Sequence, residues 1–353
     1  MTHERHLSLV IPDLFSSPQA EDSPNVAELK TLLARSTRGV CATHRDALLF
    51  EIFGFEYTPD KNLPVASITH ALHNPEQNDD YWLRADPVYM RTASDRVMMM
   101  GNDFLAITRQ EAALLGQELA PLFDAYGLQL TMPEPKCWYL RLPNDPGLFW
   151  HALSDVRGHD IHQYLPVDID SKTNARLWRR LLNEAQMLLH DSTVNHARIA
   201  RGQLPVNSLW FWGGGTLPHI AHRRFAQVWG NDALTLGMAK FSATPHTPTP
   251  ISGCHWLQQA TIPGRHLVIV EAVADFTLPD ETDDGLTRKN NIESLNRDWF
   301  SPLLAALKSR QLASLHLYTC NGTVFQATPK SIARWWKRPR SLSAYQAQLE
   351  IVQ

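Results

Sequence analysis

Residues Val194–Gly215 read VNHARIARGQLPVNSLWFWGGG. The pattern indicates a helix end, then a Gly-Gln-Leu-Pro turn, then a buried strand that stops in three glycines. Adjacent glycines let the backbone approach a ligand closely and offer its N–H groups to an anion. Arg198 and Arg201 lie just upstream, and guanidinium groups suit phosphate or carboxylate. A plain helix–loop–strand unit with a flexible turn explains the same pattern, and both interpretations stay open.

The composition is that of an ordinary globular protein. The chain has 353 residues, of which 44% are apolar and 20% charged, with a net charge of −3. Overall charge therefore gives no argument for nucleic acid or an anionic membrane as partner. The four cysteines have no metal-type spacing, and we expect reduced thiols in a cytoplasmic protein. We expect neither a signal peptide nor a membrane-spanning segment, because no apolar run is long enough.

Strand-like and helix-like segments alternate at both ends of the chain. Short apolar runs lie between helical segments, which is typical of a mostly parallel sheet covered by helices on both faces. A block of strands and one amphipathic helix interrupts this order. We therefore expect an α/β core, residues 1–80 and 147–353, with an inserted α+β domain at 81–146. Ligands bind such sheets beyond the carboxyl ends of the strands. We expect the residues that follow strands to converge there, namely Asp13, Gly213–Gly215, Asp275 and Asn321.

Several segments together resemble the archaeal-type cofactor-independent phosphoglycerate mutases of the alkaline phosphatase superfamily. The order Val-Asn, Arg-Ile, Gly, Pro, Asn, strand and glycines in Val194–Gly215 is similar to a run in that family. Ser23–Val26 resembles the family's Thr-Pro-Asn-Leu helix start. Asp46, eight residues before Gly54, resembles its Gly-Ser-Asp helix. The resemblance implies an alkaline-phosphatase-like fold, and the chain also resembles a bacterial subgroup called RpfE-type regulatory proteins.

The family's reaction needs a serine nucleophile and two divalent metals that lower its pKa and stabilise the phosphoryl oxygens. The resemblance places Arg45 at the nucleophile position, and arginine stays protonated. Asp13 and Asp275 match two metal-binding aspartates, whereas Pro279 falls on a metal-binding histidine. We therefore expect no catalytic residue. At most, we expect Asp13 and Asp275 to form a weak, vestigial site for Mn or Zn. A helix-capping role explains the position of Asp13 equally well.

The alternatives differ in what the chain binds. The first is a regulatory descendant of the mutases that has lost phosphotransfer and binds a small phosphorylated or carboxylated molecule between the domains. Its candidate contacts are Asn195, Arg198, Asn207, Gly213, Gly214, Gly215 and Arg45. For Arg45 a salt bridge is the commoner role. The second is an active metal-dependent phosphomutase or phosphatase, and the third is a nucleic-acid-associated protein acting through the basic, tryptophan-containing region around Trp335. No protein partner is indicated.

Overall fold

The computed structural model describes residues 4–15, 25–55, 61–74, 80–93, 96–169, 174–218, 222–271 and 286–345. The chain divides into two compact units. Unit 1 comprises Met1–Glu56 and Ile220–Gln353, and unit 2 comprises Tyr57–His219. Unit 2 is thus larger than the expected insertion, 81–146, because the helices and the strand that follow residue 146 pack on and pair with the strands of that insertion. Among the described residues, no helix is long and apolar enough to span a bilayer.

Unit 1 is built on a seven-stranded sheet in the order β11-β10-β12-β1-β13-β14-β2. The strands are β1 (Arg5–Val10), β2 (Thr37–Val40), β10 (Gln227–Trp229), β11 (His246–Thr247), β12 (Gly264–Ile269), β13 (Ser314–Tyr318) and β14 (Thr323–Ala327). The five from β11 to β13 are parallel, with Leu9 opposite Val268 and Leu317, and β14 and β2 are antiparallel. The predicted mostly parallel α/β sheet is therefore confirmed.

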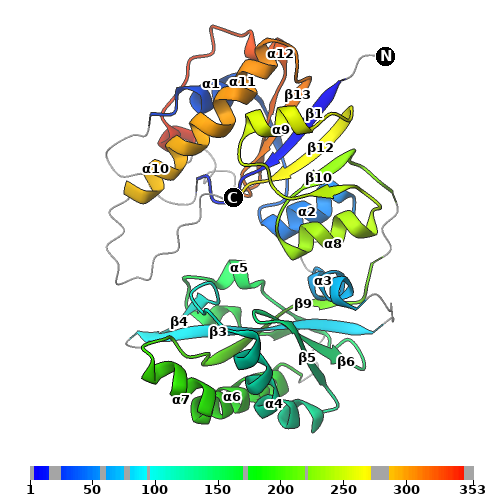
Figure 1. The fold of residues 1–353 in the computed structure, drawn as a ribbon, viewed down its shortest axis with the longest axis vertical. Helices are drawn as coiled ribbons and strands as arrows, with labels where there is room; N and C mark the ends of the chain where they lie inside the picture. The colour runs from blue at the N-terminus through cyan, green and yellow to red at the C-terminus, as the bar shows by residue number, and fades with distance from the viewer. Residues whose placement is uncertain are drawn as a thin grey trace. The chain divides into compact units, whose positions relative to one another are not determined.

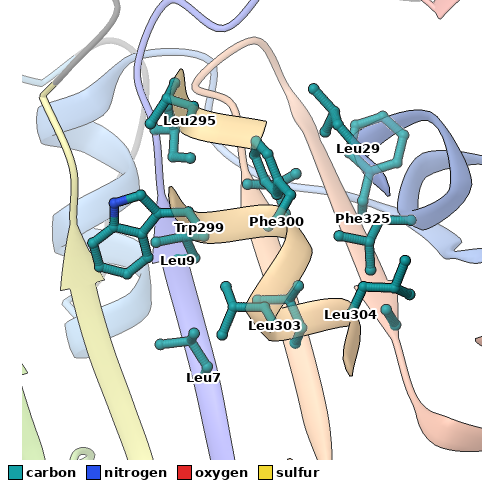
Figure 2. Close-up of a cluster of buried hydrophobic side chains, with 14 of the residues drawn as sticks. Leu7, Leu9, Leu29, Leu295, Trp299, Phe300, Leu303, Leu304 and Phe325 are labelled. Carbon is teal, nitrogen blue, oxygen red and sulfur yellow. The ribbon is translucent and has the colours of Figure 1, made fainter. Parts of the chain in front are cut away.

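Helices cover this sheet (Figure 1). They are α1 (Ala27–Arg35), α2 (Arg45–Phe53), α8 (Ala233–Phe241), α9 (Gly253–Gln259), α10 (Leu286–Leu295), the π-helical turn η2 (Asn296–Phe300), α11 (Ser301–Lys308) and α12 (Pro329–Ile332). Helices α1, α9, η2 and α11 pack together, and α2 packs with α8. Figure 2 shows Trp299, Phe300 and Leu303 beside Leu7 and Leu9 of β1, so the last long helical segment buries its apolar face on the central strand.

Unit 2 contains a five-stranded antiparallel sheet in the order β4-β3-β6-β5, with β9 paired to β3. Its strands are β3 (Tyr81–Ala93), β4 (Arg96–Gly101), β5 (Gln129–Glu134), β6 (Cys137–Leu142) and β9 (Ser208–Gly215), with a separate β7 (Leu148–Phe149) and β8 (Val167–Asp168) pair. Its helices are α3 (Val65–His73), α4 (Arg109–Asp124), α5 (Leu153–Val156), the 3-10 turn η1 (Ile161–Tyr164), α6 (Asn174–Asp191) and α7 (Thr193–Ala200). Figure 1 shows α4, α6 and α7 along one face of this sheet and α3 on the other.

The strand at Ser208–Trp212 is the main departure from the expected topology. We expected it in the parallel sheet of the core, but β9 runs antiparallel to β3 within unit 2. The expectation failed because Leu209, Trp210 and Phe211 are all buried, and a strand buried on both faces reads alike in either kind of sheet. The glycines at its end therefore do not follow a strand of the parallel sheet.

Candidate functional site

Arg45 is the first residue of α2, a helix that ends at Gly54 with φ 92°. Its guanidinium contacts three carboxylates. Nη2 lies 2.6 Å from Asp232 Oδ2 and 3.0 Å from Glu271 Oε1, and Nη1 lies 3.1 Å from Asp46 Oδ1. Asp232 follows β10 and caps α8, and Glu271 follows β12. Arg45 therefore belongs to a charge cluster at the carboxyl ends of the parallel strands, which is the ligand edge of such a sheet.

The acidic groups outnumber the cation in this Arg45 cluster. Burial alone lowers the pKa of the Arg45 guanidinium, but the charges of Asp232, Asp46 and Glu271 outweigh it and raise the pKa. Burial alone raises the pKa of Asp232, but Arg45 and hydrogen bonds from Thr235 outweigh it and lower the pKa. Each charge thus holds its partner ionised. An added anion meets an excess of negative charge here, which disfavours its binding.

Asp13 and Cys320 lie in the same neighbourhood. Asp13 follows β1 in the left-handed region, with φ 60°, and its carbonyl oxygen accepts a hydrogen bond from Arg288 Nη2 at 2.8 Å. Burial raises the pKa of the Cys320 thiol to about 12, while the charges of Arg45, Asp13 and Asp46 also act on it. Arg45 and Asp13 are therefore both close enough to Cys320 to act on its thiol. Asn321, next to Cys320, accepts a hydrogen bond from Thr319.

The described residues at this edge do not fit the binuclear metal centre that the resemblance implies. Among them, no group of three or more His, Cys, Asp or Glu side chains is arranged to hold a metal ion. A guanidinium already pairs with Asp46, Asp232 and Glu271, so these carboxylates have a cation without any metal. Asp275 and Pro279 lie outside the described residues, so the Asp13–Asp275 metal site stays a prediction.

The three glycines of β9 lie in unit 2, apart in the chain from the unit that holds Arg45. A Cβ at Gly213 would lie 3.1 Å from Val65 Cβ, one at Gly214 would lie 2.5 Å from Tyr81 Oη, and one at Gly215 would lie 2.6 Å from Pro64 Cβ. The space beside these glycines is therefore filled by the start of α3 on one face of the strand and by Tyr81 on the other. Close packing of the chain on itself explains why glycine is needed here.

The polar side chains of the same run make internal hydrogen bonds. Asn195 donates from Nδ2 to the Leu189 and Val206 carbonyl oxygens, each at 2.7 Å, and accepts from Val206 N–H at 2.9 Å. Asn207 accepts from Met90 N–H at 2.8 Å and donates to the Met90 carbonyl oxygen at 2.7 Å. Both amides thus brace the backbone around β9.

Arg198 is also engaged internally. It is 1% exposed, and it donates from Nε to the Leu204 carbonyl oxygen and from Nη1 to Glu111 Oε2, each at 2.9 Å. Glu111 also pairs with Arg201 at 2.7 Å. Arg198 therefore links α7 to α4 through a charge-assisted hydrogen bond, and a ligand contact by it stays a prediction.

Unit 2 contains a cavity of about 550 Å³ whose wall includes Asn195 and Asn207. One face of α6 forms much of the lining, with Arg179, Leu182, Asn183, Gln186, Leu189 and His190 at helical spacing. Met90, Val97 and Ile161 add apolar surface. Arg179 donates from Nη2 to the Pro166 carbonyl oxygen at 3.2 Å, and no carboxylate in the described part of the chain pairs with Arg179 or His190. Such a cavity suits a small, partly apolar anion.

Sequence reasoning missed Asp232 and Glu271 at the strand ends and Arg179 and His190 in the cavity. Asp232 carries a local signal, because it follows a short apolar strand and precedes a helix, as capping residues do. Arg179 and His190 lie eleven residues apart, so they fall on one face of α6. Nothing local shows that this face borders a cavity, because the opposite wall comes from β3, β4 and η1.

Comparison with known proteins gives partial sequence matches and a match of fold, while no protein-family model matches the chain. Over 73 residues, 20% of this chain, it is 32% identical to a probable 2,3-bisphosphoglycerate-independent phosphoglycerate mutase of Geobacter sulfurreducens, covering 17% of that protein. Over 76 residues, 22% of this chain, it is 32% identical to such a mutase of Methanothrix thermoacetophila, covering 18% of it. The matched segment therefore spans under a fifth of either relative.

Two solved structures are similar along most of the chain. One is a cofactor-independent phosphoglycerate mutase of Thermoplasma acidophilum. The match includes 98% of this chain and 99% of that protein, with 16% sequence identity and a TM-score of 0.45. The other is the PH0037 protein of Pyrococcus horikoshii. The match includes 92% of this chain and 87% of that protein, with 14% sequence identity and a TM-score of 0.52. This chain is therefore similar in part of its sequence to cofactor-independent phosphoglycerate mutases, and it shares the fold of the Pyrococcus protein.

Proposed function

We propose that this chain is a phosphoglycerate mutase-like protein that has lost phosphotransfer and binds a small anion in the cytoplasm as a regulatory protein. The ion pairs of Arg45 with Asp46, Asp232 and Glu271 carry the proposal. Under the resemblance, Arg45 stands where the mutases have their nucleophile, and a guanidinium cannot attack phosphorus. It also supplies, from the protein itself, the positive charge that metals supply in such a reaction.

The anion binds in the unit 2 cavity rather than at Arg45. Three carboxylates surround Arg45, whereas Arg179 faces the cavity without a carboxylate partner among the described residues. The polar lining from Asn183 adds a donor for phosphate or carboxylate oxygens, and Leu182 and Leu189 exclude water. The expected contacts Asn195 and Asn207 border the same cavity, which supports a ligand near them.

Loss of phosphotransfer is tested by turnover and metal content. Purified protein supplied with 3-phosphoglycerate and Mn²⁺ or Zn²⁺ is expected to form no 2-phosphoglycerate above a protein-free control. Elemental analysis after dialysis is expected to find far less than one metal ion per chain. Turnover that Asp13→Ala abolishes, or two retained metals per chain, supports the active phosphomutase or phosphatase instead.

Anion binding is tested by calorimetric titration with 3-phosphoglycerate and with inorganic phosphate. Arg179→Gln is expected to weaken binding of whichever anion binds more tightly by about tenfold or more, because a charge-assisted hydrogen bond contributes about 1.5–3 kcal/mol. Arg176→Gln is the matched control, because Arg176 is exposed on the same helix and does not line the cavity. Equal affinity in Arg179→Gln and wild type, or binding of neither probe, contradicts this part of the proposal.

A further inference from the structure

Helix α12 and the segment after it form a surface of two tryptophans and five cations. We name the Trp335 surface by its residues Lys330, Arg334, Trp335, Trp336, Lys337, Arg338 and Arg340. Trp335 is 77% exposed and Trp336 63% exposed. No Asp or Glu occurs from Pro329 to Tyr345, so the positive charge is not balanced locally. The net charge of −3 for the whole chain conceals this concentration.

The fold holds this surface in place from both ends. Ile332, which lies between Lys330 and Arg334, and Leu342 and Tyr345, which follow Arg340, belong to the buried core of unit 1. Between them the backbone closes turns, with Trp335 N–H donating to the Ala333 carbonyl oxygen at 2.8 Å and Lys337 N–H to that of Arg334 at 3.1 Å. The indoles are therefore presented outward by an ordered turn, and a partner does not have to order the segment first.

The pair of rings favours one kind of anionic partner. The Trp335 and Trp336 ring centroids are 6.2 Å apart and their planes meet at 83°. Bases of single-stranded nucleic acid stack on aromatic faces one after another, so two faces at nearly a right angle cannot both hold consecutive stacked bases. An indole at a membrane interface needs only its apolar body among the headgroups, and its ring orientation is free.

We propose that the Trp335 surface binds anionic lipid membranes, with both indoles at headgroup level and the five cations against the lipid phosphates and carboxylates. Cations near an anionic leaflet each strengthen binding, and the indoles add apolar burial. Binding is peripheral and reversible, because one short turn offers little apolar area. This surface belongs to unit 1, and the proposal is independent of the unit 2 cavity.

The test is flotation of the full-length chain with vesicles of phosphatidylcholine alone or of phosphatidylcholine and phosphatidylserine in equal amounts. Partitioning onto the mixed vesicles is expected to exceed that onto neutral ones by about a hundredfold or more and to fall as salt is raised. Lys337→Gln with Arg338→Gln is expected to reduce it by about tenfold, and Trp335→Ala with Trp336→Ala by several-fold. These side chains are exposed, so both variants are expected to fold.

Matched controls distinguish binding through the Trp335 surface from nonspecific binding to vesicles. Ile251→Ala removes another exposed apolar side chain of unit 1, 83% exposed, and Lys308→Gln removes an exposed cation. Both are expected to bind vesicles like the wild type. Equal binding to the two vesicle types, or no effect of the surface variants, overturns the proposal. The proposal is also overturned if the protein does not bind the vesicles but binds a single-stranded oligonucleotide, and if Trp335→Ala with Trp336→Ala weakens that binding.

Discussion

Arg45 and Arg179 are both helical arginines, and only Arg45 lies among carboxylates. Arg45 in unit 1 touches three carboxylates, whereas Arg179 in unit 2 borders a cavity and donates to a carbonyl oxygen. The charge of the first guanidinium is neutralised by carboxylates of its own protein, and the second keeps donors for a ligand. The comparison teaches that an arginine indicates an anion-binding site only where no carboxylate of the protein already forms an ion pair with it.

The largest expected effect is the loss of stability when the Arg45 cluster loses its cation. Arg45→Met is expected to lower the free energy of unfolding by about 3 kcal/mol, because Asp46 and Asp232, which are both largely buried, then lose their shared cation. Arg179→Met is expected to change it by less than about 0.5 kcal/mol, because its guanidinium is exposed. Urea unfolding followed by circular dichroism measures both.

Adding Asp232→Asn to Arg45→Met is the control for this prediction. It removes one uncompensated carboxylate and is expected to recover about 1 kcal/mol of the lost stability. An Arg45→Met protein as stable as wild type contradicts the idea that Arg45 and its carboxylates are electrostatically coupled.

The next effect is the change in stability at acidic pH, to which buried histidines of the two units contribute. His70 in unit 2 is buried and stacks on Trp82 with ring centroids 3.5 Å apart. Burial, and then His73, lowers its pKa from 6.5 to about 4. The unfolded chain therefore binds this proton between pH 6.5 and 4 while the folded chain does not, so stability falls as pH falls through that window. We expect a loss of about 2 kcal/mol from this group.

Unfolding free energies measured at intervals from pH 7.5 down to about 3 test this. His70→Gln is expected to reduce the slope between pH 6.5 and 4, and part of the slope remains because burial also lowers the pKa of His266 and His316 in unit 1. Asp232, with its lowered pKa, acts in the same sense but at lower pH, since its contribution is present above pH 3.8 and is lost below it. An unchanged slope in His70→Gln refutes the assignment.

A third prediction concerns the glycines of β9. Gly214→Ala is expected to cost about 1–2 kcal/mol, because its Cβ would lie 2.5 Å from Tyr81 Oη. The affinity for 3-phosphoglycerate is expected to stay unchanged. Adding Tyr81→Phe removes the nearest atom and is expected to restore part of the stability. A Gly214→Ala protein with wild-type stability and weakened anion binding supports the ligand role that the sequence suggested.

These glycines show where sequence reasoning ends. The helix at Arg45–Phe53 with its closing Gly54, and the strand at Cys137–Leu142, are predictable from the sequence because their signals are local: a left-handed glycine and a β-rich run. The surroundings of Gly214 and Arg45 are not local. Tyr81 is more than a hundred residues from Gly214, and Asp232 is nearly two hundred from Arg45. A residue type suggests a chemistry, but remote neighbours decide whether that chemistry is already used.

The smallest effect comes from making the cavity resemble the Arg45 cluster. Asn183 lines the cavity one helical turn after Arg179, so Asn183→Asp places a carboxylate beside the guanidinium. The affinity for 3-phosphoglycerate is expected to fall about tenfold, or about 1.4 kcal/mol, because the new charge pairs with Arg179 and repels the ligand. Stability is expected to change by less than about 0.5 kcal/mol. Asn183→Gln, which adds no charge, is the control. If Asn183→Asp binds as tightly as Asn183→Gln, local charge is not what distinguishes these two arginines.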